Sequence, residues 1–480
     1  MTRALRQPLL LLTLLLSASA GAFAETRDTW LGVYLMGNKL GHSHIVVEPA
    51  RWQGKQALRI TNDSRLTMSF LGQSTEQVIR SVDVTSPAYK PLSSEFSMSS
   101  MGRLTRVSAR FEPSRIVAKV SSTGGASTKV IPIPKGVSLS VDPQLAMRGQ
   151  MKVGTKVGFH YFNPATLVLE KATAEALRRD TVSHDGVAYP TLQVAVRTPM
   201  GDVTAWEDDS GDLVKMEAAF GIQMWRESRE RATAGPTDKY APPTDLAEIT
   251  SVKVDKPIDD PRAMRYLKLR LQGLRSSNVV QDDRQKVTTE TKDGVVTAEL
   301  EVRTTDIPAA QAVSIQKAGS LEPRWVRAST QVQSDDAGMR TQAAKIVAGE
   351  KNALKAALKI RDWVHEHMTV RYDIALVRSS LDVLKDKVGV CRDYAILFAG
   401  LARAAGIPTR LAVGLVYAKG SFYYHAWDEV FVGKWIDLDP TAPTALVDAT
   451  HLKFTHGDAD AMFSSGRFAG IMTAQILEAR

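Results

Sequence analysis

The first half of the chain is a series of short segments in which apolar and polar residues alternate, and this pattern limits the fold more than any other feature. Such segments recur between residues 30 and 224, for example ALRIT at 57–61, and turn pairs such as Gly37-Asn38 separate them. Period-two alternation places every second side chain on one face of a strand, and Gly beside Asn favours a tight turn. The pattern predicts an all-β sheet that curls or packs on itself, with one short helix at 172–179.

The remaining pattern divides the chain further. Residues 232–243 are rich in Pro, Ala and Thr, which is typical of a linker. A second strand-like block starts at 246, and apolar residues at helical spacing follow from 341. We therefore predict an α+β chain with five parts: a signal peptide at 1–24, a β-rich N-terminal domain at 25–231, a linker at 232–245, a small β module at 246–332 and a helix-plus-antiparallel-sheet domain at 333–480.

The first 24 residues have the three zones of a secretion signal. Arg3 and Arg6 give a basic start, residues 9–16 form a short apolar run, and AFA at 22–24 is a small-x-small cleavage site. The apolar run is short for a membrane span, and no cysteine follows it to carry a lipid. The sequence predicts a periplasmic or secreted protein with no stable membrane insertion after cleavage.

Charge and cysteine content exclude some classes of function. Loss of Arg3 and Arg6 on cleavage would lower the formal charge from +9 to +7, and no dense Lys/Arg block concentrates that charge. Nucleic acid is therefore not an expected partner. The chain has one cysteine, Cys391, so no disulfide forms within it. A lone cysteine in an exported protein is either buried as an inert apolar residue or kept for chemistry.

The surroundings of Cys391 favour chemistry. An apolar helix pattern runs from 394 to Gly406, with a proline just beyond, so Cys391 falls at the first turn of a helix. Unpaired backbone N–H groups and the helix dipole favour a thiolate there, and these N–H groups can hold an oxyanion. Gly389, just before it, is expected to let the chain turn sharply and a substrate approach.

Three alternating runs follow the helix, at 410–417, 422–432 and 434–438, and predict an antiparallel meander. His425 lies in the second run. A short hairpin centred on Gly433 would bring an aspartate of the third run beside His425, and parity alone does not choose between Asp437 and Asp439. A thiol, an imidazole and a carboxylate then provide a nucleophile, a base and an orienting group.

Four sequence blocks carry a resemblance to a known family: GVCRDYA at 389–395, AAGIPTR at 404–410, HAWDEV at 425–430 and WIDLDPT at 435–441. In order and spacing they resemble the transglutaminase-like core of the papain-like thiol superfamily, here in an exported bacterial type with a β-rich N-terminal domain. The resemblance implies a triad of Cys391, His425 and Asp439. It also suggests Tyr372 as the candidate oxyanion donor.

One position departs from the family, because Asp428 stands where many members have Asn. Strand alternation is expected to direct Asp428 away from His425. We expect Asp428, Glu429 and Asp437 to be solvated or structural groups rather than catalytic ones.

The resemblance implies an acyl-transfer enzyme acting on protein or peptide amide bonds, with cell-wall peptide as one substrate class. Water as acceptor would make the enzyme a peptidase or amidase, and a primary amine would make it a cross-linking enzyme. The alternatives are a catalytically silent binding or scaffold protein of the cell envelope, and an enzyme whose N-terminal domain covers the cleft. No calcium-binding loop is visible, so no cofactor is expected.

Other histidines give weaker signals. His42 and His44 would share one strand face as a metal pair, but no third ligand is visible. His365 and His367 do not share a helix face, so they are not expected to bind a metal. A polar tail that we expect to be a solvated loop contains His451, His456, Asp458 and Asp460.

Overall fold

A computed structural model describes most of the chain. The described residues are 26–70, 73–100, 103–122, 125–141, 151–235, 245–293, 295–305, 308–371, 378–444, 446–462, 468 and 471–480. The predicted signal peptide, most of the predicted linker and Tyr372 lie outside these ranges, so those expectations stay predictions.

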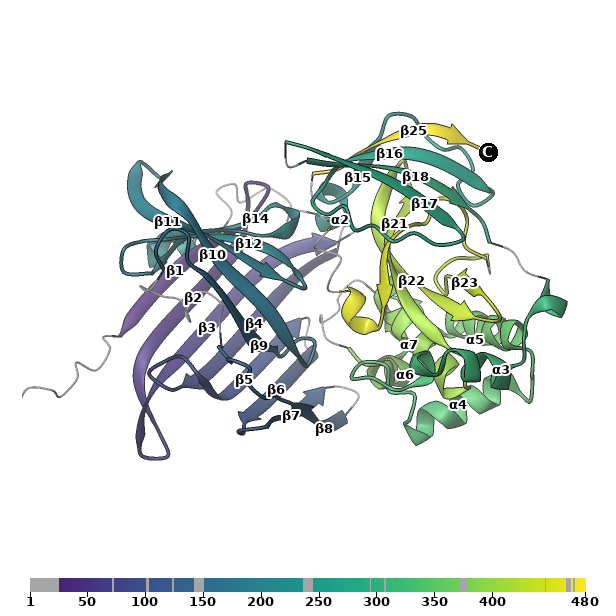
Figure 1. The fold of residues 1–480 in the computed structure, drawn as a ribbon, viewed down its shortest axis with the longest axis horizontal. Coiled ribbons are helices and arrows are strands. Elements are labelled where there is room, and N and C mark those ends of the chain that lie inside the picture. The colour runs from purple at the N-terminus through teal and green to yellow at the C-terminus, as the bar shows by residue number, and fades with distance from the viewer. Residues whose placement is uncertain are drawn as a thin grey trace, which may run out of the picture.

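The N-terminal half forms a 14-stranded sheet in which every pair of neighbours is antiparallel. Its spatial order runs from β8 back to β1 and then from β14 back to β9, so nearly all neighbours are also consecutive in sequence (Figure 1). The strands are β1 (Arg27–Leu35), β2 (Asn38–Trp52), β3 (Lys55–Phe70), β4 (Gln73–Thr85), β5 (Pro91–Ser100), β6 (Arg103–Phe111), β7 (Arg115–Ser122), β8 (Gly125–Pro132), β9 (Lys156–Asn163), β10 (Val168–His184), β11 (Val187–Thr198), β12 (Gly201–Glu207), β13 (Leu213–Glu217) and β14 (Ile222–Glu227).

This sheet curls back on itself, as the alternation predicted. Phe162 of β9 packs in one core cluster with Phe96 of β5, Val107 of β6 and Ile116 of β7, although β9 lies at the far end of the strand order. The predicted helix at 172–179 is wrong, because these residues belong to β10. There Ala172, Ala174 and Ala176 alternate inward, and period-two burial overrides the helix propensity of alanine.

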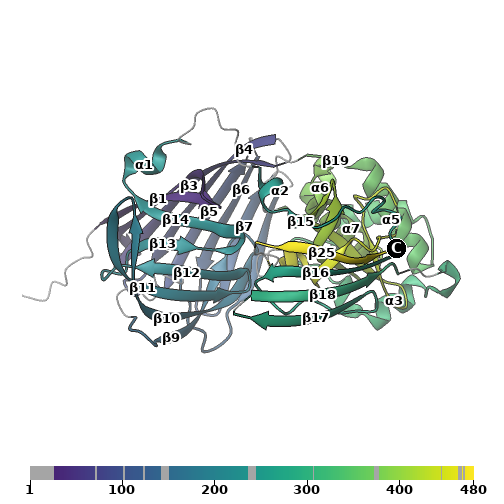
Figure 2. The ribbon, with the colours of Figure 1, turned by 90° about the horizontal axis from the view of Figure 1, so that it is seen from above.

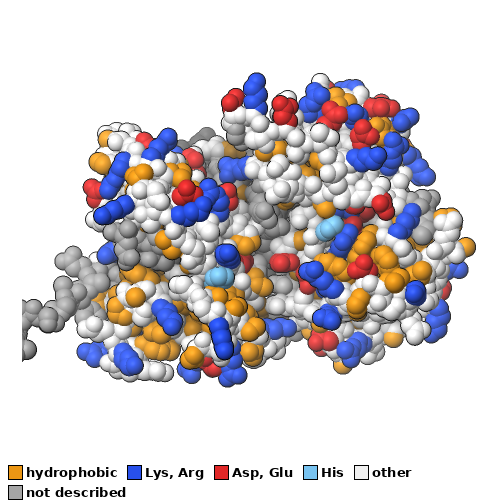
Figure 3. Space-filling view, viewed as in Figure 1, with side chains coloured by type: hydrophobic (Ala, Val, Ile, Leu, Met, Phe, Trp, Pro, Cys, Tyr) orange, Lys and Arg blue, Asp and Glu red, His pale blue; other side chains and the backbone are white. Residues whose placement is uncertain are grey.

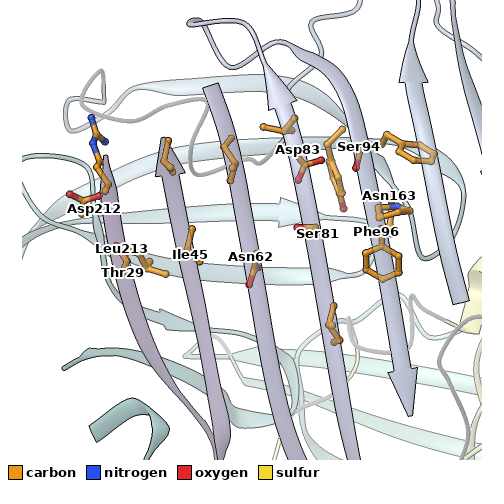
Figure 4. Close-up of a pocket in the computed structure, with 18 of the residues that line it drawn as sticks. Thr29, Ile45, Asn62, Ser81, Asp83, Ser94, Phe96, Asn163, Asp212 and Leu213 are labelled. Atoms are coloured by element: carbon orange, nitrogen blue, oxygen red, sulfur yellow. The ribbon is translucent and has the colours of Figure 1, made fainter. Parts of the chain in front are cut away.

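The curled sheet encloses a cavity of about 370 Å³. Alternate residues of β2 to β5 line it, including Ile45, Asn62, Ser81 and Phe96, and they project from neighbouring strands toward the same space (Figure 4). The inward face of the sheet is thus only partly filled by its own side chains.

Short helices and turns connect the N-terminal sheet to the C-terminal half, which holds a 9-stranded sheet and further helices. The connecting elements are α1 (Arg229–Thr233) and α2 (Leu246–Ile249), whereas η2 (Ala219–Gly221) lies between β13 and β14. The C-terminal strands are β15 (Val252–Val254), β16 (Tyr266–Leu274), β17 (Gln285–Lys292), β18 (Val295–Arg303), β21 (Thr409–Ala418), β22 (Ser421–Phe431), β23 (Trp435–Leu438), β24 (Leu452–Gly457) and β25 (Thr473–Ala479), and β19 (Thr369–Val370) and β20 (Val388–Gly389) form a separate pair. The helices and turns are η3 (Ala309–Gln311), α3 (Ile315–Leu321), η4 (Pro323–Val326), α4 (Ala337–Val347), α5 (Ala353–His367), α6 (Ser380–Asp386) and α7 (Cys391–Ala404).

The predicted small β module at 246–332 does not form a sheet of its own. The predicted hairpin is present as β17 and β18, but the main sheet order is β17-β18-β16-β25-β15-β22-β21-β24, with β23 on β22. The C-terminal strand β25 lies between β16 and β15 and joins the two parts into one sheet (Figure 2). Local alternation predicted the strands correctly, but it carries no information on which distant strand pairs with which.

Helices α4 to α7 pack together, and α7 lies against β22. Their apolar faces share a core with Val430, Val432 and Ile436 of the β22–β23 hairpin. Mostly antiparallel strands with helices gathered on one side of the C-terminal sheet are the predicted α+β arrangement. No helix among the described residues is long and apolar enough to cross a membrane.

The two halves contact each other directly. Arg103 of β6 pairs with Asp386 of α6 at 2.7 Å, and Ser122 donates a hydrogen bond to Asp382 at 2.5 Å. A cleft of about 820 Å³ between the halves is lined from one side by residues such as Lys171 and from the other by residues such as Trp325. On the face in Figure 3, Lys and Arg side chains are spread over both halves among Asp and Glu.

Candidate active site

Cys391 is the first residue of α7, as predicted. Asp393 closes this helix end, since its carboxylate accepts a hydrogen bond from the Val390 N–H at 3.0 Å. The helix stops before Gly406, which has a φ of 88°. Gly389 has a different role from the expected sharp turn: a Cβ there would lie 2.4 Å from the Cβ of Asp393, so glycine allows the capping carboxylate to approach.

The structure brings His425 of β22 to Cys391. The thiol forms hydrogen bonds with the His425 ring and with the backbone of Ala426. The His425 Nε2 lies 2.8 Å from an oxygen of Asp439, which leaves Nδ1 to face the thiol. The imidazole therefore lies between a thiol and a carboxylate, the arrangement that a thiol nucleophile needs.

Asp439, rather than Asp437, is the partner of His425, and the register of the β22–β23 hairpin explains why. Asp437 lies opposite Glu429 in that hairpin and accepts a hydrogen bond from the indole N–H of Trp427 at 2.7 Å. Asp439 lies beyond the end of β23, where the chain turns back toward His425. Its second oxygen accepts hydrogen bonds from the backbone N–H and the hydroxyl of Thr441, at 2.8 and 2.7 Å.

Arg361 of α5 holds the loop that carries Asp439. Its buried guanidinium donates to the backbone carbonyls of Asp439, Ala442 and Thr444. The sequence analysis assigned no role to Arg361. Its position inside an apolar helix pattern, at 4% exposure, marks it as a buried cation that needs acceptors.

The charges of the three groups support one another. Burial raises the pKa of the Cys391 thiol, but the hydrogen bond and charge of His425 outweigh this and lower the pKa below its ordinary value. Burial lowers the pKa of His425, yet Asp439 and Cys391 together raise it to about 10. Asp439 is only 2% exposed, and the paired histidines hold its pKa well below the usual range against the effect of burial. Both the Cys391 and the His425 shift act toward a thiolate beside an imidazolium.

For His451 the prediction from the sequence is wrong. We expected a solvated loop, but His451 is fully buried and its Nε2 lies 3.3 Å from the same Asp439 oxygen that faces His425. A local signal exists, because Asp448-Ala449-Thr450 just before His451 repeats the Asp-x-Thr pattern of Asp439-Pro440-Thr441. The rest of the expected tail is also ordered: His456 pairs with Glu429 and Asp458 pairs with Arg403, at 3.0 and 3.3 Å.

A second group of charges lies beside the site on the face of β22 that carries Trp427. Lys453 is fully buried and contacts Asp282, Glu429 and Asp437 at 2.7, 2.7 and 2.9 Å. Arg410 adds a two-pronged contact to Glu429 at 2.7 and 3.1 Å. Glu429 and Asp437 are therefore structural and buried rather than solvated.

Asp428 is buried as well. Strand alternation places it on the face of β22 opposite Glu429, as expected, and among the described residues no group forms a hydrogen bond with either of its carboxylate oxygens. Burial and the nearby charge of Asp439 raise the pKa of Asp428 well above the usual value. The pKa values of these two neighbouring carboxyl groups are thus shifted in opposite directions.

The other histidines take up structural positions. Trp30 stacks on His44 with ring centroids 3.9 Å apart and also contacts His42, while His44 pairs with Asp28. His365 contacts the carbonyl of Pro440, next to Asp439, and His367 stacks on Trp363. Neither pair belongs to a group of three ligating side chains within the described residues.

One such group does occur, at His425, Asp439 and His451, whose nitrogen and oxygen atoms all lie within 4.8 Å of one another. The same atoms are hydrogen-bonded at 2.8 and 3.3 Å. The His425 ring is paired directly with the Asp439 carboxylate and lies beside the Cys391 thiol. This arrangement suits proton transfer and ion pairing.

Comparison with known proteins agrees with this arrangement. Residues 340–440 match the family model of the transglutaminase-like superfamily, a segment that contains Cys391, His425 and Asp439. An uncharacterized protein of Mycobacterium leprae is 30% identical over 106 residues, which is 20% of this chain and 38% of that protein. The chain thus spans less than two-fifths of the length of that curated relative.

Three solved structures are similar in part. A "putative cysteine protease" from Cytophaga hutchinsonii has 17% identity and a TM-score of 0.35, covering 45% of this chain and 89% of its own. A β-barrel-like protein of a domain of unknown function from Brucella abortus has 12% identity and a TM-score of 0.31, and the match covers 42% of this chain and 94% of that protein. A "putative protease" from Parabacteroides distasonis has 13% identity and a TM-score of 0.20, covering 84% and 68%.

The match to the family model agrees with the motif order and confirms the resemblance in the C-terminal half: residues 340–440 of this chain form a domain of the transglutaminase-like superfamily.

Proposed function

We propose that the protein is an exported thiol enzyme that breaks protein or peptide amide bonds through Cys391, His425 and Asp439. The single observation that carries the proposal is the continuous contact from the thiol through the His425 ring to the Asp439 carboxylate. The export part rests on the N-terminal sequence alone.

In the proposed reaction, the Cys391 thiolate attacks the amide carbonyl carbon, and a carbon–sulfur bond forms while the carbonyl π electrons move onto oxygen. In this proposal, backbone N–H groups at the start of α7 stabilise the oxyanion. The intermediate then collapses, the carbon–nitrogen bond breaks, and the His425 imidazolium protonates the departing amine. Asp439 keeps the ring oriented throughout.

The acyl-enzyme is next attacked by water, whose proton passes to His425, and the thiolate leaves as the carboxylic acid forms. Water is the abundant acceptor in an open aqueous compartment, so we propose hydrolysis as the main outcome. A primary amine added at rising concentration would compete if the site also binds amines, and the product ratio would measure that competition.

The decisive experiment is alkylation of the full chain by iodoacetamide across pH, in the wild type and in His425→Ala. Cys391 is the only thiol, so the label reports a single site. The lowered thiol pKa predicts fast labelling of the wild type well below a pH of about 8.5, the ordinary pKa of a free thiol. The His425→Ala variant should lose this fast labelling. Equal and slow labelling of both proteins would remove the basis of the proposal and favour a silent binding protein.

A further inference from the structure

Behind His425 and Asp439 lies a second histidine–aspartate pair of similar construction. In the first pair, the Asp439 carboxylate accepts from the N–H and hydroxyl of Thr441 and contacts His425. In the second, the Asp448 carboxylate accepts from the N–H and hydroxyl of Thr450, at 2.8 and 2.5 Å, and contacts His451. Both carboxylates are thus fixed by the same two-residue turn and directed at an imidazole.

His451 connects the two pairs. Its Nε2 lies 3.3 Å from Asp439 and its Nδ1 lies 3.3 Å from Asp448. An ionised carboxylate only accepts hydrogen bonds, and a neutral imidazole donates from one nitrogen only. The two contacts hold the His451 ring from both sides, so its plane is fixed between the Asp439 and Asp448 carboxylates.

The groups around His451 are fixed. The His425 and Trp427 rings lie 5.7 and 5.4 Å from it, centroid to centroid. Arg284 donates to the backbone carbonyls of His451 and Asp448, at 2.7 and 2.5 Å. Arg262 pairs with the Asp448 carboxylate at 2.5 Å. Both arginines come from the 246–332 segment, so this segment braces the loop behind the site.

We propose that His451 is a positioning residue for the reaction at Cys391: it holds the Asp439 carboxylate against the His425 ring. This inference rests on the proposed function. Asp448, braced by Arg262, in turn holds the His451 ring.

The charges near Asp439 explain why such a residue is useful. Asp439 is buried, and Asp428 lies close enough for the two carboxyl groups to interact electrostatically. The negative charge of Asp439 also opposes formation of the Cys391 thiolate, although it stabilises the His425 imidazolium. A second ring on Asp439 keeps this carboxylate on His425, and it does so without contacting the thiol.

The test is the pH profile of Cys391 alkylation in the full chain, with iodoacetamide as the probe, for the wild type, His451→Gln and Asp448→Asn. His451→Gln removes the ring that the two carboxylates fix, so Asp439 is no longer held against His425 by an oriented partner; the apparent pKa of the thiol should rise by about one unit, and labelling below both pKa values should slow about tenfold. Asp448→Asn preserves the side-chain shape but weakens the contact that orients the His451 ring, so a smaller shift in the same direction is expected.

The matched control is His456→Gln, five residues along the chain, because His456 pairs with Glu429 and not with Asp439. Its profile should match the wild type. A merely structural His451 would change the amount of folded protein but not the apparent thiol pKa, and that result would overturn the inference. If His451→Gln does not fold, an unchanged or downward-shifted profile in Asp448→Asn overturns it instead.

Failure of the proposed function gives a different result. In that case the wild-type thiol itself titrates as an ordinary thiol, and His425→Ala does not change its labelling. An activated wild-type thiol that depends on His425 but ignores His451 and Asp448 would refute only the positioning role.

Discussion

The N-terminal and C-terminal halves of this molecule differ in how many charged residues they bury. Among the described residues of the N-terminal sheet, Glu170 and Glu207 are the charged residues buried as whole residues. The C-terminal half buries many more, and they include Arg284, Arg361, Arg378, Asp382, Asp393, Arg403, Asp428, Glu429, Asp437, Asp439, Asp448 and Lys453.

The difference follows the connectivity of each sheet. Neighbouring strands of the N-terminal sheet are mostly consecutive in sequence, and apolar alternation is enough to hold such a meander. The C-terminal sheet interleaves distant strands, and charged side chains such as Lys453 of β24 join them by ion pairs to β22 and the β17 loop. Burying charge is costly unless each charge is paired, so we infer that the C-terminal half keeps these groups for its site.

The largest expected contrast is in activity. Cys391→Ser should reduce turnover of a peptide amide by at least about 10⁴-fold, because loss of one member of a triad removes most of its effect. His44→Ala, on β2 of the N-terminal sheet, should leave turnover unchanged. Steady-state kinetics of the two variants check this, and activity retained by Cys391→Ser would exclude the thiol mechanism.

A fully buried and a half-buried lysine should sharpen the comparison in stability. Lys453→Met leaves Glu429 and Asp437 without their buried cation and should cost about 3–5 kcal/mol of unfolding free energy. Lys215→Met, which removes a cation between Trp206 and Trp225 in the N-terminal sheet, should cost about 1 kcal/mol or less.

Urea unfolding followed by hydrogen exchange and mass spectrometry separates the two sheets and measures both costs. Equal losses for the two lysines would show that the C-terminal charge cluster adds nothing beyond ordinary packing.

Acid should unfold the C-terminal half first. Burial raises the pKa of Glu429, Asp439 and Asp448, but their paired cations outweigh it, and all three values lie below the usual carboxyl range. The stabilisation from such groups is complete above the unfolded value of about 4 and is lost as pH falls through the lowered values. Hydrogen exchange between pH 5 and pH 2 should show earlier loss of protection in β22 to β24 than in β2 to β5, and the reverse order would contradict this.

The smallest expected effect concerns Asp428, for which the dependence of stability on pH runs in the opposite direction. Burial raises its pKa, so it destabilises the fold increasingly as pH rises above about 4, the unfolded value. Asp428→Asn should therefore raise the unfolding free energy at pH 7 by about 1 kcal/mol, and the gain should vanish near pH 3. The exposed control Asp209→Asn should change stability by less than about 0.5 kcal/mol at either pH. A gain that persists in acid would point to packing instead of charge.

Much of the fold and of the candidate site was predictable from the sequence because the signals are local. Alternation at 410–438 predicted the meander, and Gly406 with its following proline marked the end of the helix that begins at Cys391. The failures are residues whose partners are distant. The alanines at 172–176 favour a helix by themselves, and strand pairing in the sheet overrides that preference.

The sequence by itself determined the strand-rich N-terminal half, the helix that presents Cys391 and the order of thiol, imidazole and carboxylate, because turns, caps and periodicity act within a few residues. Strand parity left Asp437 and Asp439 open, and the family resemblance pointed to Asp439, which the register then brings to His425. Only the tertiary structure decided that the 246–332 strands join the sheet of the site and that His451 lies behind Asp439. These outcomes depend on strand register and on burial, which bring together groups that no local pattern connects.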